Sequence, residues 1–261
     1  MSLVLSTGLV NYMMGERALR KGLEDCVLDI YGGTSAPVTA DEAPLGTKLC
    51  RITKASGSVA TTDRSTPRVY KITIPDATDG NTVKINVTVD GVGPTTYTYT
   101  IVNPPDDTDT KVAIKVARML NDIAQLAAIA DQDVTAPGAL WVQGLIDGLD
   151  LTLADGGGTT TATVTAKQAA ARVNTLYFGP ASGGIISKPS DSWSGVNLAT
   201  GVASYFRFVL PSDSAILSTT DLRIQGLIST SASDLDMSNT TLTISATTTI
   251  DNYTLTLPMT A

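Results

Sequence analysis

The strongest constraint on the fold is a strict alternation of apolar and polar residues in the first half of the chain. The apolar members of three such runs are Tyr70, Ile72 and Ile74, then Val83, Ile85, Val87 and Val89, and then Tyr97, Tyr99 and Ile101. Successive side chains of a β-strand point to opposite faces, so each run predicts a strand with one buried face. Asp90-Gly91 supplies a turn between two of the runs. We therefore predict an antiparallel meander over residues 70–101.

The residues after this meander follow a helical period instead. One side of the expected helix is apolar and is formed by Val112, Val116, Met119, Leu120, Ile123 and Ala127. Residues 107–109 are available to cap its start, since Asp and Thr side chains accept from free backbone N–H groups. Further strands are expected over 141–142, 149–153 and 162–166. Gly156-Gly157-Gly158 has no Lys-Ser/Thr pair after it, so it predicts a hairpin tip and not a phosphate-binding loop.

The last third of the chain, residues 170–261, consists of short apolar runs separated by turn-rich segments. Only 16% of the residues are charged and 5% aromatic, and the abundant Thr and Val favour strands. Such spacing predicts a β-sandwich or jelly-roll-like barrel. Residues 1–60 hold too few strands to fold alone. We therefore predict a mainly β protein with a discontinuous outer domain, 1–60 with 170–261, and an inserted α+β domain over 67–167.

The first 24 residues predict a short helix with an apolar side, which Ser6 or Thr7 can cap. Methionine adapts to irregular surfaces, so this side suits a partner protein. We hypothesise that the helix is a docking element whose interface residues are Leu9, Met13, Met14, Leu19 and Leu23. Deleting residues 1–24 is then expected to leave a folded β domain that no longer joins its partners.

Composition argues against several classes of function. The chain has no histidine, which removes the usual general base and the commonest metal ligand. Its net charge is −7 and no Lys/Arg run exceeds two residues, which argues against nucleic-acid binding. No apolar stretch approaches the ~20 residues that cross a bilayer, and the opening lacks the pattern of a secretion signal. We predict a non-enzymatic protein with no cofactor and no metal, made in the cytoplasm.

The two cysteines, Cys26 and Cys50, leave two interpretations open. Free cysteines are usually buried, and cytosolic synthesis favours reduced thiols. The alternative is a disulfide between them, or between subunits, that forms after assembly.

Two acidic clusters are candidates for calcium sites. They are formed by Asp106, Asp107 and Asp109, and by Asp234 and Asp236. Calcium takes six to eight oxygen ligands, and neither cluster has the spacing of an EF-hand. We favour a helix cap for the first cluster and a turn for the second.

Aromatic residues in the last third are candidates for subunit contact. Trp193 is either an exposed anchor or, as we favour, a core residue. Alternation places Phe206 and Phe208 on one face of a strand, where they are expected to form core. Tyr205 and Arg207 share the other face, which makes them the better candidates for a packing surface.

The two ends of the chain resemble a group of tailed-bacteriophage virion structural proteins. The resemblance covers roughly residues 3–53 and 172–259. Its motifs are Leu5-Ser6-Thr7-Gly8-Leu9, Val27-Leu28-Asp29-Ile30-Tyr31-Gly32-Gly33, Ala40-Asp41, Gly46-Thr47, Lys188-Pro189, Trp193-Ser194-Gly195, Gly201, Tyr205-Phe206-Arg207-Phe208, Thr219-Thr220, Arg223-Ile224-Gln225-Gly226, Asp234-Leu235-Asp236 and Leu255-Thr256-Leu257-Pro258.

The resemblance implies a virion protein that oligomerises and binds capsid, neck or tail subunits. A head decoration or a neck or collar component is the function we expect. The alternatives are a tail-tube, baseplate or fibre-attachment component and, less favoured, a module that binds host glycans. The inserted domain is a departure from the short members of the group, and no role is carried over to it.

Overall fold

The computed structural model describes residues 3–15, 19–33, 35–75, 78–89, 92–102, 108–123, 126–130, 138–145, 151–169, 171, 173–179 and 181–256. The chain divides into two compact units. The outer unit comprises residues 1–64 and 173–261, and the inserted unit comprises residues 65–172. Both contain antiparallel sheets and few helices, so the prediction of a mainly β fold is confirmed.

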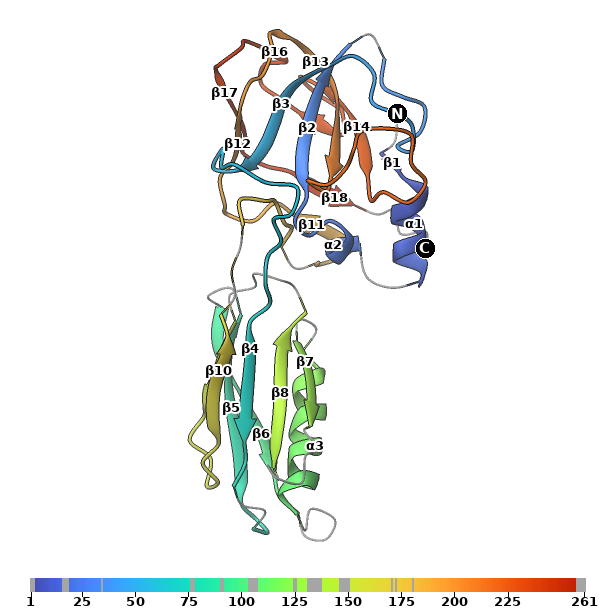
Figure 1. Cartoon of the computed structure of the whole chain (residues 1–261). Helices are drawn as coiled ribbons and strands as arrows, with labels where there is room; N and C mark the ends of the chain where they lie inside the picture. Colours follow the sequence, from blue (N-terminus) through green and yellow to red (C-terminus); the bar gives the residue numbers. More distant parts are fainter. Residues whose placement is uncertain are drawn as a thin grey trace. The chain divides into compact units, whose positions relative to one another are not determined.

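The outer unit joins the two ends of the chain in one sheet. Its strands are β1 (Val4–Leu5), β2 (Val27–Gly32), β3 (Thr47–Lys54), β11 (Ile185–Ser187), β12 (Trp193–Val196), β13 (Gly201–Val209), β14 (Ile224–Ser229), β15 (Leu235–Asp236), β16 (Thr241–Leu242), β17 (Thr247–Ile250) and β18 (Thr254–Thr256). The order across the main sheet is β1-β14-β13-β2-β3-β12-β17, while β11 pairs with β18 (Figure 1). Because β2 pairs with β13 along most of its length, neither end of the chain builds this sheet alone.

One face of this sheet lies on an apolar core. The register aligns Ile224, Phe208, Leu28 and Ile52 across β14, β13, β2 and β3, and all four are buried. Aromatic rings complete the core, with Phe178 meeting Trp193 edge-on at 5.5 Å between ring centroids. Such edge-to-face pairs stabilise a core beyond the area that they bury.

Two short helices close the edge of this core. They are α1 (Thr7–Gly15) and α2 (Leu19–Gly22). As expected, the Ser6 hydroxyl caps α1, accepting from the N–H of Leu9 at 3.2 Å. The same hydroxyl donates to the Asp221 carbonyl at 2.7 Å, which ties α1 to the other end of the chain. Among the helices that the structure describes, none is long and apolar enough to span a bilayer.

The described residues of the inserted unit form two sheets and one helix. Its elements are β4 (Val69–Thr73), β5 (Thr82–Val89), β6 (Val92–Thr100), α3 (Asp109–Asn121), β7 (Leu126–Ala130), β8 (Ala139–Gly144), β9 (Leu151–Asp155) and β10 (Thr163–Gln168). One sheet has the order β10-β4-β8-β7 and the other β6-β5-β9. Helix α3 packs on β7 and β8 (Figure 1). Ile72, Ile85, Val116 and Leu140 belong to the core that these elements share.

The predicted meander over residues 70–101 is wrong in its pairing. β5 and β6 form the expected hairpin, but β4 pairs with β8 and β10 in the other sheet. Alternation identifies which side chains are buried, and it carries no information on which strands are neighbours. The turn at 90–91 lies outside the described residues.

Two further local predictions in the inserted unit are corrected. The helix was expected to reach Ala127, yet it ends at Asn121, whose side-chain amide donates to the Ala128 carbonyl and accepts from the Ala128 N–H. Ala127 therefore belongs to β7. Residues 156–158 do not form a hairpin tip, because β9 and β10 lie in different sheets. Instead the N–H of Gly156 donates to the Lys84 carbonyl, alongside β5.

Candidate functional site

Alternation along β13 creates a second, polar face on the outer sheet. Phe206 and Phe208 point into the core, so Tyr205 and Arg207 lie on the opposite side. The register sets one row across four strands on this side, namely Gln225 on β14, Arg207 on β13, Asp29 on β2 and Arg51 on β3. We call this row, together with Tyr31, Tyr205 and Arg223 beside it, the polar face.

Loops cover the polar face, and this corrects the expectation that Tyr205 and Arg207 form an external packing surface. The hydroxyl of Tyr205 donates to the Leu45 carbonyl at 2.6 Å, and Arg207 Nη1 donates to the Glu42 carbonyl at 2.7 Å. Gln225 Nε2 donates to the Pro37 carbonyl at 2.7 Å. Arg207 is consequently only 1% exposed and Tyr205 fully buried. The loop of residues 37–45 satisfies polar groups that a bare sheet would present to solvent.

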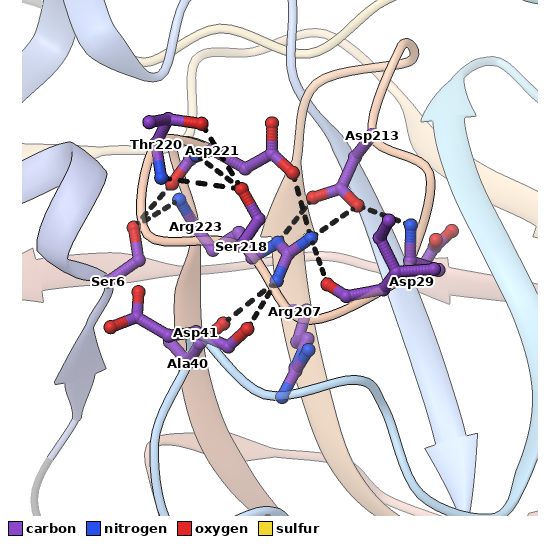
Figure 2. Close-up of polar contacts among 12 residues, drawn as sticks. Ser6, Asp29, Ala40, Asp41, Arg207, Asp213, Ser218, Thr220, Asp221 and Arg223 are labelled. Atoms are coloured by element: carbon purple, nitrogen blue, oxygen red, sulfur yellow. Dashed lines mark hydrogen bonds and ion pairs between the residues drawn. The ribbon is translucent and has the colours of Figure 1, made fainter.

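Arg223 anchors a second loop to the polar face. Its Nε and Nη2 atoms bind the Asp213 carboxylate at 2.5 and 2.9 Å, and Nη2 also contacts Asp221 at 2.9 Å (Figure 2). Nη1 donates to the Asp41 carbonyl at 3.0 Å. Burial alone would lower the pKa of Arg223, but the hydrogen bonds and charge of Asp213 outweigh it and raise that pKa. This fork–fork geometry is the strongest form of the arginine–carboxylate interaction.

Asp29 is the anionic centre of the row. It accepts from Arg51 Nε and Nη2 at 2.7 and 2.8 Å and contacts Lys48 Nζ at 2.6 Å. Beside it, the rings of Tyr31 and Tyr205 stack with 5.0 Å between centroids. Burial, and then the charge of Asp29, raise the pKa of the Tyr31 hydroxyl above its usual value. Tyr31 therefore stays neutral at physiological pH and serves as a packing element.

Arg207 differs from the other buried arginine because its partners carry no charge. Its Nε donates to Gln225 Oε1 at 2.8 Å, and its other nitrogens donate to the carbonyls of Glu42 and Thr39. In the part of the chain that the structure describes, it forms no ion pair with a carboxylate. Burial lowers the pKa of this guanidinium from its usual value. Hydrogen bonds to uncharged acceptors hold this buried charge, and the charge of Asp213 favours it without direct contact.

Two adjacent turns of the outer unit and the strand ends beside them present aliphatic side chains to solvent. The turns bind each other, since the N–H of Ser245 donates to the Asn197 carbonyl at 2.9 Å and the N–H of Ile244 donates to Thr200 Oγ1 at 3.0 Å. The exposed side chains are Val196 (50%), Leu198 (56%), Val202 (60%) and Ile244 (55%). We call these four residues the aliphatic rim. The rim was not predicted from the sequence, because its four residues lie at strand ends and in turns and share no periodic pattern.

The inserted unit carries a second accessible surface on the four-stranded sheet. The register aligns Thr165, Lys71, Trp141 and Ile129 across β10, β4, β8 and β7. These residues alternate with core residues, so they lie on the side away from the core. Lys71 Nζ lies 5.5 Å from the centre of the Trp141 ring, within cation–π range, and Ile129 is 71% exposed. We call this row the open face.

The predicted docking helix is corrected by its packing. Leu9, Leu19 and Leu23 are buried in the core of the outer unit, and Met13 packs against the same core. Met14 alone of the five predicted interface residues is highly exposed, at 84%. The four other residues complete the core of their own unit and are not available to a partner.

Trp193 is a core residue, in agreement with the favoured interpretation, and the proposal of an exposed anchor is wrong. Its ring is in contact with Phe178, Phe208 and Tyr253, and Lys188 Nζ lies 5.8 Å from its centre. The indole is almost completely buried.

Cys26 and Cys50 are both free and buried, so no disulfide joins them in this structure. Burial raises the pKa of each thiol, that of Cys50 to about 12. Thiolate is the reactive form of cysteine. Both residues are therefore inert components of the core at neutral pH.

The turn role favoured for the second acidic cluster is confirmed for Asp236, whereas the cap favoured for the first cluster is supplied by Thr108, with Asp109 in the first turn of α3. Asp106 and Asp107 lie outside the described residues, while Thr108 caps α3 by accepting from the N–H of Lys111. Asp234 accepts from the N–H of Leu227, and Asp236 accepts from Ser233 within a turn. Within the described ranges, no group of three or more Cys, Asp or Glu side chains could hold a metal ion.

No known protein-family model matches this chain, and no curated protein resembles it at a significant level.

Proposed function

We propose that this chain is a structural subunit of a tailed-bacteriophage particle, which oligomerises and binds its neighbours through the aliphatic rim. The single observation that carries the proposal is the rim itself, four aliphatic side chains that are each half exposed or more on two bonded turns and the adjoining ends of β12 and β13. A head-decoration, neck or collar position is favoured by the resemblance of the chain ends to virion proteins. Tail-tube, baseplate and fibre-attachment positions are the alternatives.

The rim is suited to association by its rigid backbone as well as by its apolar area. Contiguous exposed apolar surface favours association, because burial removes it from water. The hydrogen bonds between the two turns hold the rim backbone before any partner binds, which reduces the entropy lost on association. The covered polar face adds to this rigidity, since an ion pair ties the loop of Asp213, and hydrogen bonds tie the loop of residues 37–45, to one sheet.

Substitutions in the rim test the proposal. Val202→Asp and Ile244→Asp place a charge in the rim without touching the core, so each variant is expected to fold, to become monomeric and to be absent from particles. Thr98→Asp on the exposed face of β6 is the matched control and is expected to assemble normally. Sedimentation gives the oligomeric state and electron microscopy of particles gives incorporation. Full assembly of both rim variants would refute the proposal.

The open face favours a second candidate function, the binding of host glycans. Sugar rings stack on aromatic faces, and Trp141 lies half-buried on the open face beside Lys71 and Thr165. This candidate predicts that the protein binds a subset of glycans on an array and that Trp141→Ala abolishes the signal, whereas Thr98→Ala retains it. Equal binding by the two variants, or none by the native protein, would eliminate it.

A further inference from the structure

A small hollow lies against the polar face of the outer unit. Its volume is about 10 Å³, enough for a single sphere of the size of a water molecule. Its charged lining consists of Lys48, Arg51, Arg207, Arg223, Asp29 and Asp213. The rest of the lining is neutral, and the partly exposed side chains of Lys48 and Arg51 connect it to solvent.

Positive charge is in excess around this hollow. Four of the charged lining residues are cations and two are anions. Asp29 is bound by Lys48 and Arg51, and Asp213 is bound by Arg223, which also contacts Asp221 outside the lining. Arg207 is left with the uncharged acceptors of Gln225, Glu42 and Thr39. Lys48 and Arg51 share one carboxylate but are partly exposed to solvent, so Arg207 is the buried part of the excess.

A guanidinium without a carboxylate in direct contact is an unusual state for a buried side chain. Buried charges are normally paired, because removal from water is costly unless an opposite charge replaces the lost solvation. Arginine cannot relieve this cost by losing its proton. Its guanidinium has five N–H groups, and three acceptors contact its nitrogens, so further N–H groups are available to an anion.

We propose that this hollow binds a monatomic anion, chloride in the cell, as the counter-ion of Arg207. The size of the hollow favours a halide over phosphate or sulfate, whose four oxygens need several times the space. The chain as a whole carries a charge of −7, so attraction of an anion is a local property of this face. The inference is independent of the proposed assembly role.

Bound chloride would link the sheet to the loop that covers it. Arg207 holds residues 39 and 42 of this loop through their carbonyls, and Asp213 on the second loop also lines the hollow. A ligand that binds only the folded state stabilises it in proportion to its occupancy. Halide is therefore expected to raise the unfolding temperature of the outer unit.

Thermal unfolding of the full-length protein at constant ionic strength tests the proposal. Replacing sodium gluconate with sodium chloride or bromide is expected to raise the transition of the outer unit saturably, by about 2–4 °C for a domain of this size. Gluconate is too large for the hollow, so it serves as the reference anion. Arg207→Gln is expected to abolish the halide effect. Lys54→Gln, which removes a cation from a partly exposed pair with Asp191 outside the lining of the hollow, is expected to retain it.

Crystals soaked in bromide keep the proposal testable if Arg207→Gln fails to fold. An anomalous peak beside the Arg207 guanidinium is expected in the native protein. A peak in the hollow together with a saturable halide effect supports the proposal. Water in the hollow, with bromide absent or bound elsewhere, overturns it, and so does an unfolding temperature that is the same in all three salts.

Discussion

Arg207 on β13 lies directly opposite Asp29 on β2, yet within the described chain the two side chains form no ion pair. The Asp29 carboxylate binds Arg51 and Lys48 on β3, whereas the Arg207 guanidinium binds Gln225 and the loop of residues 37–45. One carboxylate is thus shared by two cations at the edge of the polar face, while the central guanidinium relies on neutral acceptors. The stability of the outer unit should depend strongly on Asp29.

Asp29→Asn tests this dependence. The amide is nearly isosteric but leaves Arg51 and Lys48 without their counter-charge, so the free energy of unfolding is expected to fall by about 3–5 kcal/mol. Asp191→Asn removes the carboxylate of a more exposed pair, in which Lys54 Nζ is 3.3 Å away, and is expected to cost less than about 1 kcal/mol. Urea unfolding of both variants gives the comparison. Similar losses would show that burial of Asp29 is unimportant.

The N-terminal helices supply a second prediction. Leu9 and Leu23 are completely or almost completely buried, so Leu9→Ala or Leu23→Ala is expected to destabilise the outer unit by about 2–5 kcal/mol. Met14→Ala on the exposed side of α1 is expected to change the free energy of unfolding by less than about 0.5 kcal/mol. Chemical denaturation measures all three. Deletion of residues 1–24 is then expected to unfold the outer unit, contrary to the docking role that the sequence first suggested.

The buried thiols predict how stability depends on pH. Burial raises the pKa of Cys50 from 9.0 to about 12, so above pH 9 the unfolded chain loses this proton while the folded chain retains it. The contribution is fully present below pH 9 and is lost as pH rises toward 12, at up to about 1.4 kcal/mol per pH unit. Cys50→Ala is expected to flatten the decline between pH 9 and 10.5 relative to the native protein. Parallel slopes in urea titrations would contradict this.

The burial of β13 on both faces shows how much of the site could be predicted from the sequence. Alternation correctly separated Phe206 and Phe208 from Tyr205 and Arg207. It could not predict that both faces are buried, because the cover comes from residues 37–45, whose polar turn-rich sequence has no periodicity of its own. Only the positions of the Glu42 and Leu45 carbonyls, set by the folded loop, make the polar face an interior.

The sequence also could not predict which strands are neighbours in a sheet. β4 and β5 have the same alternation and are consecutive along the chain, yet they lie in different sheets. The pairing follows from how α3 and the three-stranded sheet share the core around Ile72 and Val116, which is a property of the packed unit. The fold class followed from composition and period, because these report on burial. The positions of the rim and the open face depend on which strands pair, and strand pairing depends on contacts between residues distant in sequence.

Gly226 gives the last prediction, since it shows why the core needs a residue without a side chain on β14. It lies opposite Phe206, and a Cβ there would come within 2.6 Å of the Phe206 ring and 2.8 Å of the Asp234 Cβ. Gly226→Ala is therefore expected to destabilise the outer unit by about 1–3 kcal/mol through overpacking. Gly15→Ala at the end of α1 meets nothing within 4 Å and is expected to be neutral or slightly stabilising. Thermal and urea unfolding of the two variants measure the difference. Equal stability of Gly226→Ala and Gly15→Ala would contradict the prediction, because it would mean that the ring of Phe206 shifts freely within its core.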